Sequence, residues 1–187
     1  REPVEAIIIT RTAAGVGFLD VIVQNFNNAA PTKTLELFLL GSSVTFTGNG
    51  AKFNYNTTGS SVPAQSDAGG GVVSVGAINA SDPGTDSIAS YSSRGPANNG
   101  ALKPDVTAID GVRVTGAGGF SDPFFGTSAA APHVAGLAAL LLELRPDLRA
   151  GTPGEDPAAE RAALRNAIIA TAVDLGIAGP DNTFGHG

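Results

Sequence analysis

Hydrophobic and polar positions alternate over short distances before residue 50, and nothing there repeats with a helical period. Four runs rich in branched and aromatic residues cover 4–10, 16–26, 35–40 and 44–47. In the second run Leu19, Val21 and Val23 fall on one side of an extended chain, which gives that run a single apolar face. Asn, Gly and other turn-forming residues separate the runs. The pattern predicts a few antiparallel strands.

From Ser60 onward the pattern changes. Residues 72–78 are almost continuously apolar, as in a parallel strand that is covered on both faces. Two further short strands are predicted at 106–109 and 112–115, and then two helices at 127–144 and 156–172. Asp156-Pro157 suits the N-cap and first position of the second helix. Strands followed by helices indicate part of an α/β domain.

Length and composition exclude several classes of protein. The chain has 187 residues, about one domain, and a net charge of -6, which argues against a nucleic-acid partner. It has 0 Cys, which excludes disulfides, thiolate metal sites and a cysteine nucleophile. The most apolar stretch, 129–144, is interrupted by Pro132, His133 and Gly136, so we expect no membrane partner.

The segment 126–136, Gly-Thr-Ser-Ala-Ala-Ala-Pro-His-Val-Ala-Gly, carries the candidate chemistry. It places Ser128 where a glycine-rich loop enters the first turn of a predicted helix. Amides of the first turn lack partners within the helix, and the helix dipole is positive there. An oxyanion that forms beside Ser128 would therefore be stabilised by backbone N–H groups. A Gly-Thr-Ser helix start on its own is more often a simple N-cap.

The whole segment closely resembles the nucleophile segment of the subtilases, the subtilisin-like serine peptidases. Three further motifs follow the order of that family: 73–77 resembles its buried strand, 91–96 its Ser-Ser-Arg-Gly-Pro turn, and 103–108 its Lys-Pro-Asp-Val-x-Ala segment. The resemblance covers 60–187 and implies a parallel-sheet α/β fold, a polypeptide substrate, and Ser128 as the nucleophile that forms an acyl-enzyme. The chain departs from the family at Ile109-Asp110, where subtilases commonly have Pro-Gly.

A second departure concerns the rest of the catalytic machinery. The catalytic Asp and His of subtilases precede the serine, whereas the 2 histidines here, His133 and His186, both follow it. His133 stands five residues beyond Ser128, about 140° around a helix, so we expect it to be packed and structural. Asn54 and Asn56 lack the Ala-Gly that precedes the oxyanion Asn of the family.

These departures predict an incomplete active site. Residues 1–55 resemble the end of the β-rich insertion that many secreted bacterial subtilases carry, and residues 56–187 resemble the C-terminal part of the catalytic domain. The catalytic Asp and His and the oxyanion Asn are then expected upstream of Arg1. We expect the isolated chain to be inactive.

Two other functions are compatible with parts of the sequence. An α/β-hydrolase would use Ser128, then Asp174 or Asp181, then His186, in the chain order of that fold. The hydrolase motif Gly-x-Ser-x-Gly is not met, because residue 130 is Ala. A non-catalytic interaction module built on the β-rich N-terminal part has no obligate motif, so the sequence leaves it open, as it does the oligomeric state.

Metal binding and location follow from the resemblance alone. Subtilases often bind calcium, and the resemblance implies no other cofactor. No Asp-x-Asp-x-Asp-Gly loop occurs, so we expect the acidic residues of the loops to lie in solvated turns. These residues are Asp82, Asp86, Asp105, Asp122 and Asp181. The family also implies an extracellular or cell-envelope location.

Overall fold

The structure, a computed structural model, describes residues 59–62, 71–82, 84–149 and 156–187. All of them belong to the second of two units into which the chain divides, residues 48–187. The antiparallel strands predicted before residue 50, and the predicted boundary between residues 55 and 56, lie outside the described residues. Those two features remain predictions.

Two parallel strands form the sheet of the described part, as the apolar runs predict. Strand β1 covers Val75–Asn79 and strand β2 covers Val106–Asp110. They pair in register from Val75 opposite Val106 to Asn79 opposite Asp110. Gly76, Ala77 and Ile78 at the centre of β1 are buried, which fits a parallel strand with cover on both faces.

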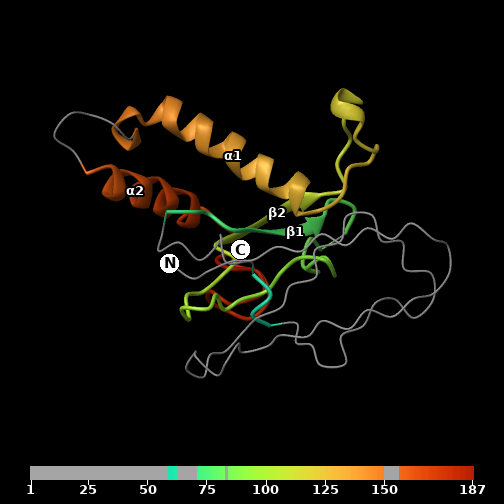
Figure 1. The fold of residues 1–187 in the computed structure, drawn as a ribbon, viewed down its shortest axis with the longest axis horizontal. Coiled ribbons are helices and arrows are strands. Elements are labelled where there is room, and N and C mark those ends of the chain that lie inside the picture. Colours follow the sequence, from blue (N-terminus) through green and yellow to red (C-terminus); the bar gives the residue numbers. More distant parts are fainter. Residues whose placement is uncertain (1–58, 63–70, 83, 150–155) are drawn as a thin grey trace, which may run out of the picture. The chain divides into compact units, whose positions relative to one another are not determined.

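Two helices lie side by side (Figure 1), and the first of them packs against both strands of this sheet. Helix α1 covers Thr127–Leu144 and helix α2 covers Pro157–Ile169. Asp156 caps α2, because its carboxylate accepts a hydrogen bond from the amide of Ala158 at 2.9 Å. Val106 from β2, Val134 from α1 and Ile168 from α2 form the buried core between the three elements. The α/β class predicted from the sequence is therefore confirmed.

Helix α1 is more apolar than its described neighbours can cover. Leu137, Leu140 and Leu144 are 42%, 59% and 77% exposed. By length and composition α1 could cross a membrane, although the core helices of soluble proteins pass the same test. A helix with apolar residues on most sides is usually surrounded by protein or lipid, so α1 has a face that further structure would cover.

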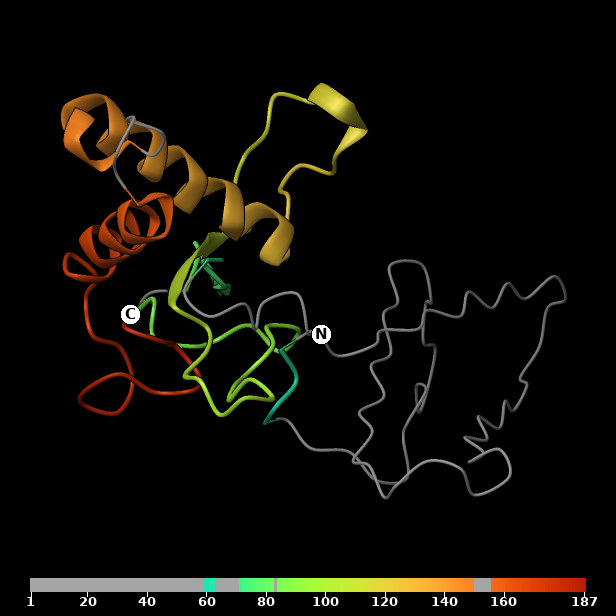
Figure 2. The same cartoon turned by 60° about the vertical axis from the view of Figure 1, so that its left-hand side comes forward.

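The predicted strand at 112–115 is wrong. The chain turns at Gly111, whose φ is 65°. Within 112–115 only Val112 pairs with another described residue, in an isolated antiparallel bridge with Phe124. A short 3-10 helix, Ala117–Gly119, lies at the far end of the loop between them. Figure 2 shows this loop standing away from the strands and helices. Exposed Arg113 and Asp122 join its two sides through an ion pair at 2.9 Å.

The expectation of a solvated turn is also wrong for Asp105, which is 0% exposed. Its Oδ2 accepts from Nζ of Lys103 at 2.7 Å and from the amide of Ser74 at 2.6 Å. Its Oδ1 accepts from Nε of Arg165 in α2 at 2.9 Å. The carboxylate thus joins the start of β2 to α2, and two cations compensate for its burial.

Candidate functional site

Ser128 is the second residue of α1, and its side chain is exposed. The helix begins with two bonds to the carbonyl of Gly126, from the amides of Ala129 at 2.8 Å and Ala130 at 3.3 Å. Within the part of the chain that the structure describes, neither the amide nor the hydroxyl of Ser128 has a hydrogen-bond partner. Both groups are therefore free to meet a ligand at the positive end of the helix dipole.

Pro132 further changes the backbone at this site. It is inside α1 rather than at its start, so it offers no N–H to the carbonyl of Ser128 four residues earlier. The helix nevertheless continues unbroken to Leu144.

The loop that enters α1 is held by Asp110, the last residue of β2. Oδ2 of Asp110 accepts a hydrogen bond from the amide of Gly126 at 2.7 Å and another from the hydroxyl of Tyr91. Gly126 has φ 111° and ψ 163°, a backbone region that is essentially restricted to glycine. The conformation of the residue two before Ser128 therefore requires glycine, and its amide is bonded to Asp110.

The contact with Asp110 changes the pKa of Tyr91. Partial burial, the hydrogen bond to Asp110 and the negative charge of Asp110 together raise the pKa of Tyr91 to about 12 from an ordinary value of 10.0. The phenol therefore stays protonated at neutral pH and donates to the carboxylate. A pKa that is raised in the folded state contributes stability below pH 10, and this contribution is lost as the pH rises towards 12.

This contact gives a spectroscopic prediction. In an Asp110→Ala variant the pKa of Tyr91 should fall from about 12 towards 10.0, because two of the causes that raise it are removed while partial burial remains. Phenolate absorbance measures it, and a Tyr55→Phe background isolates Tyr91, since the chain has 2 Tyr. Circular dichroism over the same titration checks that the chain stays folded. An unchanged pKa in the variant would show that Tyr91 and Asp110 do not interact.

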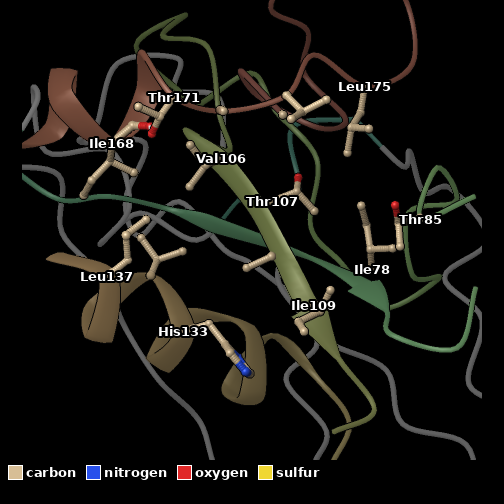
Figure 3. Close-up of a pocket in the computed structure, with 15 residues that line it drawn as sticks. Ile78, Thr85, Val106, Thr107, Ile109, His133, Leu137, Ile168, Thr171 and Leu175 are labelled. Atoms are coloured by element: carbon tan, nitrogen blue, oxygen red, sulfur yellow. The ribbon is translucent and has the colours of Figure 1, made fainter. Parts of the chain in front are cut away.

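His133 is exposed rather than packed, contrary to our expectation. Its Nδ1 donates to the carbonyl of Ala129, one turn earlier in α1, at 2.8 Å. The ring borders an apolar cavity of about 420 Å³ along β2, where Figure 3 shows it beside Leu137 of the same helix. Ser128 does not line this cavity. The structure therefore does not pair His133 with Ser128.

His186 lies at the other end of β2 from Ser128. Its amide donates to the carbonyl of Asp105 at 2.9 Å, whereas the residue two before Ser128 is bonded to Asp110. A strand rises about 3.3 Å per residue, so these anchoring points are roughly 16 Å apart. A nucleophile and its base must lie within hydrogen-bond reach of each other. The structure does not bring together the histidine and serine that an α/β-hydrolase would use.

The two aspartates of the hydrolase alternative stabilise local turns. Oδ1 of Asp181 accepts from the amides of Thr183 and Phe184 at 2.7 and 2.8 Å. Oδ2 of Asp174 accepts from the amide of Gly179 at 2.8 Å. Both carboxylates therefore have a structural use within the C-terminal segment.

Some candidates fall outside what the structure describes. Asn54 and Asn56 are among the residues that it does not describe, so their place relative to Ser128 stays a prediction. Among the described residues there is no group of three or more His, Cys, Asp or Glu side chains that could hold a metal ion.

Sequence reasoning missed Asp110 and Tyr91 as parts of this site. One signal was available, because Asp110 stands where subtilases commonly have Gly. Tyr91 carried no signal of its own, since only the fold brings its hydroxyl to the end of β2.

Comparisons with known proteins identify the family of this chain. The model of the subtilase family, the peptidase S8 family, matches residues 40–187. Serine protease AprX of Bacillus subtilis (strain 168) is 36% identical over 102 residues, which cover 45% of this chain and 22% of that protein. The chain thus spans less than a quarter of this curated relative, and no solved structure gives a significant match. Since the family model covers most of the chain, including all the described residues, the protein belongs to the subtilase family of serine peptidases.

Proposed function

We propose that this chain carries the nucleophile of a serine endopeptidase, and that the nucleophile is Ser128. The observation that carries the proposal is the state of this residue in a member of the subtilase family. Its hydroxyl is exposed in the first turn of α1, and its amide is unpaired among the described residues. A serine that merely capped the helix would stand at the N-cap and bond a backbone amide through its hydroxyl. The N-cap here is Gly126, and the Ser128 hydroxyl has no hydrogen-bond partner among the described residues.

The proposed reaction is peptide hydrolysis in two steps. Oγ of Ser128 attacks the carbonyl carbon of the substrate while a base takes the hydroxyl proton, and the resulting oxyanion accepts a hydrogen bond from the Ser128 amide. The C–N bond then breaks, the leaving amine receives the proton, and an acyl-enzyme remains. Water hydrolyses this ester by the same route and restores the serine.

We infer that the base comes from outside these 187 residues. The chain has 2 His. His133 donates to its own helix, and the backbone of His186 is anchored at the far end of β2. The exposed face of α1 agrees with this inference, because Leu137, Leu140 and Leu144 are residues that a larger catalytic domain would cover. An upstream histidine and aspartate and an oxyanion asparagine, as the family resemblance implies, would complete the site.

A fluorophosphonate probe tests this proposal, because it reacts with a serine only when a base activates the hydroxyl. We expect no appreciable labelling of the 187-residue chain and no cleavage of casein by it. The polypeptide extended upstream in its natural reading frame should be labelled on Ser128, as peptide mass spectrometry would show.

Two results would contradict the proposal. Labelling of a serine other than Ser128 in the extended polypeptide would assign the nucleophile elsewhere. Labelling of Ser128 in the 187-residue chain that His186→Ala removes would favour the α/β-hydrolase alternative instead.

A further inference from the structure

Asp110 joins three segments that are distant in the sequence. It ends β2, its Oδ2 accepts from Tyr91 in the turn that follows β1, and the same oxygen accepts from Gly126 at the start of α1. The side chain is 0% exposed. The carboxylate therefore lies next to the point where the loop before Ser128 enters α1.

Stability alone does not explain this carboxylate. Its other oxygen, Oδ1, is buried and has no hydrogen-bond partner among the described residues. A buried carboxylate with an unpaired oxygen lowers stability, and no Lys, Arg or His of the described part forms an ion pair with it. Asp105, which directly precedes the other end of β2, has two such cations. Local features that cost stability are concentrated at functional sites.

The contacts of Asp110 act on the backbone that carries Ser128. Gly126 adopts a conformation restricted to glycine, and its amide is directed at Oδ2 of Asp110. Its carbonyl accepts the first bonds of the helix, from Ala129 and Ala130. Gly126 thus connects the carboxylate of Asp110 to the helical turn that contains the hydroxyl and amide of Ser128.

The packing next to Asp110 adds a steric constraint. Gly111 has φ 65°, and a Cβ placed there would lie 2.7 Å from Cε1 of Phe125. Phe125 directly precedes Gly126, so the loop approaches the end of β2 as closely as a glycine permits. Both the hydrogen bond and this close approach limit the movement of the loop.

We propose that Asp110 and Tyr91 are positioning residues that set the orientation of Ser128 for attack. The inference rests on the proposed function, in which Ser128 is the nucleophile. Neither residue touches the reacting atoms: Asp110 acts through Gly126, and Tyr91 acts through Asp110. Because small misplacements of a nucleophile cost large factors in rate, the pair affects the chemical step more than the binding of substrate.

The test uses the complete polypeptide that carries this chain, with a peptide substrate and with fluorophosphonate labelling. Asp110→Ala should lower kcat about 100-fold and Tyr91→Phe about 5-fold, with KM within about 2-fold of the parent in both. Asp110→Asn should recover most of kcat, because its amide oxygen can accept the same two hydrogen bonds. Asp82→Ala is the matched control, since in the described part of the chain the side chain of this aspartate bonds only to the amide of Ser87 in its own turn.

Each outcome decides between the two proposals. If Ser128→Ala is inactive but Asp110→Ala and Tyr91→Phe keep the kcat of the parent per titrated active site, the positioning role is wrong and the proposed function stands. If Ser128→Ala is active, the proposed function itself is wrong. If Asp110→Ala does not fold, Tyr91→Phe decides, because Tyr91 is 51% exposed and its ring can remain in place. Both variants could also lose activity because fewer molecules are active. If kcat per titrated active site is then unchanged, the positioning role is overturned.

Discussion

Replacing Ser128 by Ala in the complete polypeptide should lower peptidase activity at least about a thousandfold and abolish fluorophosphonate labelling. The substitution removes the only atom that forms the acyl-enzyme in the proposed reaction, and no other group can take its place there. The amount of folded protein should not change, because the side chain is exposed and bonds to no described residue. Initial rates with a peptide substrate and an unfolding curve measure the two quantities.

Ser87→Ala provides the control for Ser128→Ala. Ser87 is likewise exposed and lies in a turn of the same unit, and among the described residues its hydroxyl bonds only to the neighbouring Asp86. Activity should stay at the level of the parent in this variant. Full activity in Ser128→Ala would reject this serine as the nucleophile.

Asp105→Ala should destabilise the 187-residue chain by about 3–5 kcal/mol, the usual effect of removing one partner from a buried ion pair. The variant leaves Lys103, which is 3% exposed, with the carbonyl of Val72 at 3.1 Å as its remaining partner. It also deprives the amide of Ser74 of its acceptor. Urea unfolding, followed by circular dichroism, measures the change in the free energy of unfolding.

Asp147→Ala is the control for Asp105→Ala. Asp147 also pairs with an arginine, Arg145 at 2.6 Å, but both side chains are 59% exposed. Water screens such a pair, so the unfolding midpoint should hardly move. Equal midpoints for Asp105→Ala and the parent would show that the buried cluster does not contribute to stability.

Local sequence patterns were sufficient to predict much of the described fold. The apolar run at 72–78 and the segment from Val106 became the two parallel strands, because continuous apolar residues suit strands buried on both faces. The helix predicted at 127–144 has those bounds in the structure, and Asp156 caps the second helix as expected. Helix propensity, capping and apolar periodicity are encoded within a few residues, so one sequence reveals them.

Predictions from the sequence were wrong where residues far apart in the sequence determine the local structure. Val112 and its neighbours have the composition of a strand, but among the described residues Val112 pairs only through an isolated bridge to Phe124. Asp105 resembles a turn residue until Lys103 and Arg165 are brought to it. Sequence composition near a residue does not reveal which charges the fold will place around it.

The sequence by itself determined the family, the identity of Ser128 as the candidate nucleophile, and the position of both histidines of these 187 residues after Ser128. The family motifs are contiguous in the sequence, and the positions of the histidines can be read without knowing the fold. Only the tertiary structure decided that His133 and His186 do not reach Ser128, because separation along a helix or strand becomes a distance only in three dimensions. It also brought Tyr91 and Gly126 to Asp110, since hydrogen bonds between segments depend on how strands and loops pack.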